Sequence, residues 1–259
     1  MPWPAVATTL IIAINDVVTL GNLMPENPLY LQLRGRLVDL IKTGELPPAS
    51  RLPGERLLAE RFATTRVTLR QALTQLESEG LIHRRNRRGW FVSPRRVEYS
   101  PNHDQSFDQY VSAQGRHPQT EVLDVRRQPA TAEAAQALGI ACGQVTLHVK
   151  RRRYIDGRAV LLERIWLRDD LLPGLAEGDF STSLWQRLWE EYGLALARKS
   201  LRLYPTALTG DEAETLGVHS GCAGLCVTRV THDREGRALE YDEDYWLHDA
   251  ICLRVEVAM

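Results

Sequence analysis

Apolar residues recur at helical spacing in the second quarter of the chain. Leu69, Leu73 and Leu76 stand at i, i+4 and i+7, which predicts an amphipathic helix from Arg66 to Glu79 with its leucines against a core. Thr65 stands at the N-cap position, so the first backbone N–H groups of this helix would be open to a phosphate. A shorter amphipathic helix precedes it across a tight turn. Two short helices joined in this way are typical of a helix-turn-helix.

Two short apolar runs follow that helix, one around Ile82 and one from Trp90 to Val92. Between them the turn contains four arginines: Arg84, Arg85, Arg87 and Arg88. The pattern predicts a β-hairpin, and the charge at its tip favours a wing that lies along DNA. Upstream, leucines at helical spacing predict a first helix from Leu29 to Lys42, which would pack behind the helix that reads DNA.

The rest of the chain contains an internal repeat. The segment Leu138–Arg151 is echoed by Leu216–Arg229, and the turn Asp156-Gly157 is echoed by Glu235-Gly236. Each unit is predicted to hold a short helix, a turn bounded by glycine, and two strands joined by a hairpin. Two such units predict an α+β domain with an antiparallel sheet.

Two further segments complete the pattern. Prolines at both ends and the lack of periodicity predict a linker over residues 93–103. Between the two repeat units, the run from Ser183 to Tyr192 predicts an amphipathic helix, and we expect Ser181 or Thr182 to cap it.

One predicted strand carries four consecutive basic residues, Lys150 to Arg153. Alternation places Arg151 and Arg153 on one face and the other two side chains on the opposite face. A solvated face accounts for only one of these pairs, so we expect the first pair to form an anion site. Glu163 and Glu240 would then offset its charge or accept hydrogen bonds from a ligand. Surface salt bridges are the alternative role for these glutamates.

The charges are distributed unevenly along the 259 residues. The net charge is −1, but residues 24–100 hold 14 Lys and Arg against 8 Asp and Glu, whereas residues 101–259 hold 18 against 24. A basic segment joined to an acidic one suits a DNA reader attached to a different kind of domain. The hydrophobic content of 44% and charged content of 25% are typical of a soluble globular protein.

Other chemistry finds little support in the sequence. The four cysteines lack zinc-site spacing and are expected to be free thiols: Cys142, Cys222, Cys226 and Cys252. The chain has no Gly-x-Ser-x-Gly, no glycine-rich phosphate loop with its lysine, and no His-Glu-x-x-His. We therefore expect neither an enzyme nor a cofactor. The apolar run Ala5–Ile14 is too short to span a membrane.

The N-terminal half resembles the winged helix-turn-helix of GntR-family bacterial transcription regulators. The motifs that carry the resemblance are Pro28-Leu-Tyr-Leu-Gln, Gly44-Glu-Leu-x-Pro, Arg51-Leu-Pro-x-Glu-Arg, Thr65-Arg-x-Thr-Leu-Arg and Leu76-Glu-x-Glu-Gly-Leu. The resemblance implies that DNA is contacted by Arg56, Thr65, Arg66, Thr68 and Arg70, and by the wing residues Arg85, Arg87 and Arg88. The family's usual serine before the second helix is Gly54 here, and a usual wing glycine is Arg87.

The C-terminal half resembles the UTRA effector-binding domain of the HutC subfamily, whose fold is shared with chorismate lyase. The residues at the family's ligand positions are Ser106, Phe107, Arg151, Arg153, Glu163, Ser183 and Glu240. Ile165 and Trp246 stand where relatives have serine and tyrosine. The resemblance implies control by a small anionic effector. A phosphonate or phosphate ester is our first expectation, and a carboxylate such as urocanate is the alternative.

The expected organisation is thus an extension (1–23, disordered or a mis-assigned start), a winged helix-turn-helix (24–92), a linker (93–103) and an effector-binding and dimerisation domain (104–259). We expect a cytoplasmic homodimer that represses transcription from a palindromic operator and has no membrane partner. A lyase-like enzyme domain fused to a DNA-binding module is one alternative. A constitutive DNA-binding architectural protein is another.

Overall fold

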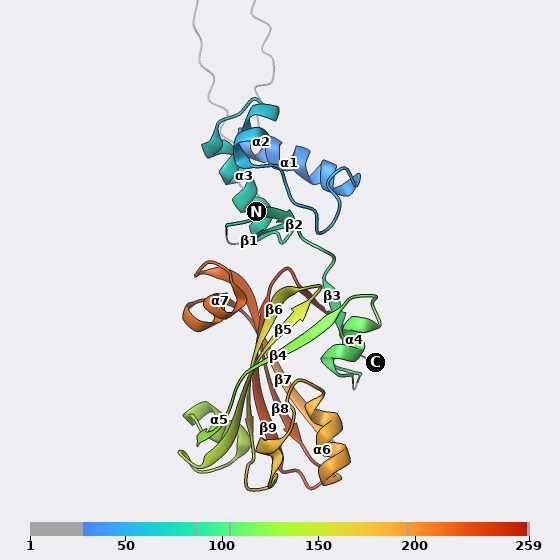
Figure 1. Ribbon diagram of the computed structural model, residues 1–259, viewed down its shortest axis with the longest axis vertical. Coiled ribbons are helices and arrows are strands. Elements are labelled where there is room, and N and C mark those ends of the chain that lie inside the picture. The colour runs from blue at the N-terminus through green and yellow to red at the C-terminus, as the bar shows by residue number, and fades with distance from the viewer. Residues whose placement is uncertain (1–27, 86, 104, 196, 258–259) are drawn as a thin grey trace, which may run out of the picture.

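The computed structural model describes residues 28–85, 87–103, 105–195 and 197–257. A small helical part stands at one end of the long axis, and a larger part built on one sheet occupies the rest (Figure 1). The extension expected at 1–23 lies outside the described residues. None of the helices in the described ranges is long and apolar enough to cross a membrane.

The helical part is a winged helix-turn-helix. Its elements are α1 (Leu29–Lys42), α2 (Glu55–Arg61), α3 (Arg66–Ser78), β1 (Ile82–Arg85) and β2 (Gly89–Val92). The α3 helix begins as predicted, because the Thr65 hydroxyl accepts a hydrogen bond from the Thr68 backbone N–H at 3.2 Å. It ends just before Gly80, whose φ of +73° is left-handed. The leucines predicted to face the core are fully buried.

The wing is an antiparallel hairpin with Ile82 opposite Val92 and Arg85 opposite Gly89. Arg87 has a φ of +57°, a left-handed conformation that glycine adopts at lower cost. This geometry explains why a glycine is usual at that position in the family.

The larger part is an α+β domain around a six-stranded antiparallel sheet. Its strands are β4 (Pro118–Pro129), β5 (Val145–Ile155), β6 (Arg158–Leu167), β7 (Arg198–Leu208), β8 (Cys222–His232) and β9 (Ala238–Leu247). They lie in the order β4-β5-β6-β9-β8-β7, so the hairpins β5–β6 and β8–β9 meet at the centre of the sheet. Two short helices precede these hairpins, α5 (Ala132–Leu138) and α7 (Gly210–Leu216). The predicted repeat is therefore confirmed as two equivalent units.

Smaller elements border the sheet: β3 (Val97–Tyr99), α4 (Phe107–Ser112), the 3-10 turn η1 (Leu175–Glu177), α6 (Leu184–Tyr192) and β10 (Ile251–Leu253). Strand β3 lies within the segment predicted as a linker and pairs in parallel with β10. In Figure 1, α4 and α6 lie on the same side of the sheet. Between them and the sheet lies the cavity described next.

Candidate functional site

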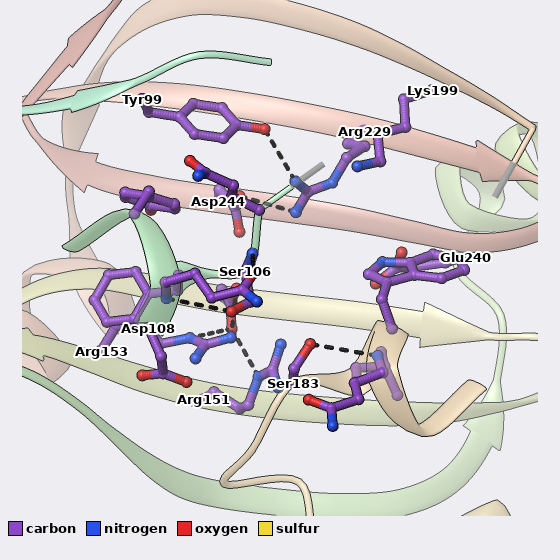
Figure 2. Close-up of a pocket in the computed structure, with 18 of the residues that line it drawn as sticks. Tyr99, Ser106, Asp108, Arg151, Arg153, Ser183, Lys199, Arg229, Glu240 and Asp244 are labelled. Carbon is purple, nitrogen blue, oxygen red and sulfur yellow. Dashed lines mark hydrogen bonds and ion pairs between the residues drawn. The ribbon is translucent and has the colours of Figure 1, made fainter. Parts of the chain in front are cut away.

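A cavity of about 550 Å³ lies between the sheet, α4 and α6. All seven residues that the sequence placed in a ligand site line it: Ser106, Phe107, Arg151, Arg153, Glu163, Ser183 and Glu240. They come from α4, β5, β6, α6 and β9, so the fold brings distant segments together (Figure 2). Sequence reasoning missed four charged residues of the same lining: Asp108, Lys199, Arg229 and Asp244.

Two buried arginines share one carboxylate at the floor of the cavity. Glu163 Oε2 accepts hydrogen bonds from Arg151 Nε at 2.7 Å and from Arg153 Nε at 2.9 Å. All three side chains are at most 7% exposed. Burial opposes ionisation of Glu163, but the two guanidinium groups outweigh it and lower the pKa of Glu163 to about 2. The three groups therefore carry a net charge of +1.

The remaining arginine donors are partly used within the protein. Arg151 Nη1 donates to the backbone carbonyls of Phe180 and Thr182 at 3.2 and 3.3 Å, and Arg153 Nη1 donates to Thr120 Oγ1 at 2.7 Å. Glu163 already lies between the two arginines, and the anion site expected at this pair stays a prediction. An anion would have to bind beside this ion pair.

Both serines of the lining begin helices. Ser106 forms a capping box, in which its hydroxyl accepts from the Gln109 backbone N–H at 3.3 Å and the Gln109 side chain accepts from the Ser106 backbone N–H. Ser183 caps α6 by accepting from the Gln186 backbone N–H at 3.4 Å. The cap expected at Ser181 or Thr182 is thus wrong, since Ser183 has the extended backbone that a cap needs. Each serine hydroxyl keeps its own hydrogen to donate.

A second charged cluster lies on β8 and β9. Arg229 Nε donates to Asp242 Oδ2 at 2.8 Å, and Arg229 Nη2 lies 3.4 Å from Asp244 Oδ2. The Tyr99 hydroxyl accepts from Arg229 Nη1 at 3.4 Å (Figure 2). Burial raises the pKa of Asp244 to about 7 and also raises that of Glu240, even though Arg229 opposes both shifts. The internal repeat could have revealed this cluster, because it aligns Arg229 with Arg151.

The predicted DNA-binding residues of the two short helices are exposed, apart from Thr68, which is half-buried. Arg66 projects from the first turn of α3, next to Val67, which is 69% exposed. Arg70 is paired with Glu55 of α2 at 2.7 Å. The Thr68 hydroxyl lies 3.0 Å from that of Thr65, and Arg56 pairs with Glu60 at 2.8 Å.

The predicted wing residues differ in their surroundings. The Arg85 guanidinium lies 4.6 Å from the centre of the Phe91 ring, and its Nε donates to His83 Nε2 at 3.4 Å. Arg87 and Arg88 are exposed. Among these three predicted residues, Arg87 and Arg88 therefore have freer access to a phosphate than Arg85.

Comparison with known proteins supports the family resemblance of both the N-terminal and the C-terminal half of the chain. Residues 29–92 match the model of bacterial regulatory proteins of the gntR family, and residues 113–251 match the UTRA domain. The chain is 32% identical to the HTH-type transcriptional repressor NagR of Bacillus subtilis (strain 168), over 86% of this chain and 91% of NagR. It is 34% identical to the probable transcriptional regulator PhnF of Escherichia coli (strain K12), over 79% of this chain and 86% of that protein. The crystal structure of PhnF from Mycobacterium smegmatis has a TM-score of 0.62 and 25% identity, over 87% of this chain and 99% of that one.

Proposed function

Because the chain belongs to the GntR family of bacterial regulatory proteins and carries a UTRA domain, we propose that it is a cytoplasmic transcriptional repressor controlled by a small anionic ligand. The observation that carries the proposal is that one chain contains both an exposed basic helix-turn-helix and, in its larger part, a charged cavity of about 550 Å³. The named relatives are regulators, which gives the lyase-like enzyme alternative no support.

On DNA, α3 would lie in the major groove and the wing would follow the backbone. Arg66 suits a guanine edge because its guanidinium can donate two hydrogen bonds to O6 and N7. The exposed methyl groups of Val67 suit a thymine methyl. Arg87 and Arg88 would neutralise phosphates. Two copies of the chain, joined through the C-terminal domain, would place two α3 helices on a palindromic operator.

The ligand would bind with its anionic group beside Arg151 and Arg153, where the net charge with Glu163 is positive. The hydroxyl of Ser183 and the first N–H groups of α6 would donate hydrogen bonds to it. A phosphonate or phosphate ester has three oxygens to accept these donors, so we favour it over a carboxylate, which has two.

Ligand binding would act on DNA through the sheet. Strands β6 and β9 carry Glu163 and Asp244 in the cavity, and the same strands lead toward Arg158 and Asp249 next to the winged domain. A ligand that binds one arrangement of the two parts more tightly changes the free energy of DNA binding by at most that difference in affinity. Such coupling free energies are typically about 1–3 kcal/mol.

The test uses the full chain and an operator selected from random duplexes. We expect a panel of alkylphosphonates, sugar phosphates and carboxylates to contain at least one compound that weakens operator binding in an anisotropy titration. Arg151→Ala should abolish that response while operator affinity without ligand stays near wild type. If operator binding does not respond to any compound, or if the response survives in the variant, the proposed control site is wrong.

A further inference from the structure

The cavity has two halves of different charge balance. On β5 and β6, one carboxylate, Glu163, serves two arginines. On β8 and β9, one arginine, Arg229, faces three carboxylates: Glu240 and Asp244, which line the cavity, and Asp242, which is buried outside the lining. Lys199 of β7 adds a cation to the second half, and Asp108 lies near Arg153 in the first. The first half is then balanced, and the second keeps an excess of one carboxylate.

The acidic half contains two carboxylate oxygens without a hydrogen-bond partner among the described residues, Asp242 Oδ1 and Asp244 Oδ1, and of these two residues Asp244 lines the cavity. Asp244 is 6% exposed, and its Oδ1 atom is buried without a hydrogen-bond partner among the described residues. Its other oxygen has only the long contact to Arg229 at 3.4 Å. Asp244 lines the cavity and is drawn there in Figure 2. A buried acceptor left unpaired is costly, and a donor supplied by a ligand would remove that cost.

The two halves are held at a fixed separation by the sheet. Arg151 is in register with Glu163, and Glu163 is in register with Asp244. Arg151 and Asp244 are therefore two strand spacings apart, roughly 10 Å between backbones. One small molecule with charges at both ends can contact both.

From these observations we infer that the cavity takes a dipolar ligand, whose acidic group binds beside Arg151 and Ser183 and whose ammonium group binds Asp244. This inference rests on the proposed function and adds the second charge to the ligand. A neutral hydroxyl would satisfy Asp244 Oδ1 but would leave the excess of carboxylates uncompensated, which is why we infer a cation.

The protonation of Asp244 gives an independent signature. Burial raises its pKa to about 7, so part of the population is protonated at neutral pH. The charged groups that face it are Arg229 and Arg153, which favour ionisation, and Glu163 and Glu240, which oppose it. Asp242, Tyr99 and Tyr110 are also close enough to interact with its charge. An ammonium group would lower this pKa, and binding at pH 7 would therefore release protons.

The experiment is calorimetry on the full chain with two matched pairs of probes. These are 3-aminopropylphosphonate against propylphosphonate, and 4-aminobutyrate against butyrate, so that both kinds of acidic group are covered. In the pair whose acidic group the cavity accepts, we expect the amino compound to bind at least about tenfold more tightly than the compound without the amino group. Asp244→Asn should reduce this preference to less than about threefold. Glu243→Gln, on the opposite face of β9, should keep it.

The outcomes separate the two proposals. If both members of a pair bind equally and Arg151→Ala abolishes both, the ammonium site is wrong and the anion site stands. If none of the four compounds binds or alters operator binding, both the dipolar ligand and the anion site are refuted. If Asp244→Asn does not fold, the wild-type preference and the proton release, measured in buffers of different ionisation enthalpy, decide the question. Equal binding without extra proton release would then refute the inference.

Discussion

Ser93 Oγ donates a 2.7 Å hydrogen bond to Asp249 Oδ2, which joins the end of the wing to the segment after β9. Asp249 also accepts two hydrogen bonds from Arg158, each at 2.9 Å. Arg85 Nε can only donate, so His83 Nε2 must accept and His83 Nδ1 carries the hydrogen. His83 Nδ1 lies 3.3 Å from Ser93 Oγ and donates to it. A chain of hydrogen bonds therefore runs from a wing arginine to the ligand-binding part.

Ser93→Ala should weaken this contact between the two parts. A hydrogen bond to a charged group contributes about 1.5–3 kcal/mol, so opening of the contact should become roughly tenfold or more frequent. Hydrogen exchange at the Val97 amide, which donates to Ala250 across the same contact, should accelerate accordingly. Ser112→Ala, at an exposed serine of α4, serves as the control. Unchanged exchange in Ser93→Ala would mean that this contact does not hold the parts together.

The same contact should give the protein a specific sensitivity to acid. Burial, and to a smaller extent the positive charge of Arg158, lower the pKa of His83 to about 3. A histidine of an unfolded chain has a pKa of about 6.5. Below pH 6.5 the unfolded chain gains a proton that the folded chain does not, so the free energy of unfolding should fall as the pH falls. His83→Gln should flatten the loss between pH 6.5 and 5, a window above the titration of Glu163. His103→Gln, at an exposed histidine, should leave the profile unchanged.

The sequence predicted those features that local chemistry determines. Thr65 and Gly80 set the bounds of α3 because a cap and a left-handed residue act within one turn. The repeat predicted the two hairpin units, and alternation placed Arg151 and Arg153 on one face. The resemblance placed the seven ligand positions that the cavity brings together.

Features that depend on which strands become neighbours could not be predicted in this way. Asp244 faces Glu163 only because β6 and β9 pair at the centre of the sheet. The sequence of neither strand by itself predicts this pairing. The helix cap at Ser183, in place of Ser181 or Thr182, depends on the path of the preceding loop. The pairing of β3 with β10 joins segments about 150 residues apart in sequence, so the stretch around it carried no local periodicity.

Glu163→Gln should destabilise the C-terminal part. It would leave two buried guanidinium groups side by side without their carboxylate, and breaking a buried ion pair costs about 3–5 kcal/mol. The midpoint of urea unfolding should therefore fall, while Glu190→Gln, at an exposed glutamate of α6, should leave it nearly unchanged. Adding Arg153→Met should recover part of the loss, because it removes one of the two repelling charges. No recovery would argue against charge repulsion as the cause.

The wing should contribute through charge. Replacing Arg87 and Arg88 together by alanine should weaken specific and nonspecific DNA binding alike. The slope of log affinity against log salt should fall by about 1 for each phosphate that the wing no longer neutralises. Arg202→Ala, at an exposed arginine of β7, tests whether any removal of positive charge has this effect, and we expect it to have little. A weaker affinity with an unchanged slope would assign the wing a structural role.

Arg66 should read sequence. It projects from the first turn of α3 and is exposed, so its replacement by alanine should leave the fold intact. A bidentate contact from arginine to a base edge contributes about 1–3 kcal/mol of discrimination, so Arg66→Ala should weaken operator binding about tenfold and relax the preference at one base pair of each half-site. Binding to unrelated duplexes should change much less, because phosphate contacts dominate there. Arg36→Ala, at an exposed arginine of α1, makes the same change of charge outside the reader helix and should leave the preference intact. If the affinity for operator and for unrelated DNA falls equally, Arg66 contacts the DNA phosphate backbone, and another side chain of α3 recognises the bases.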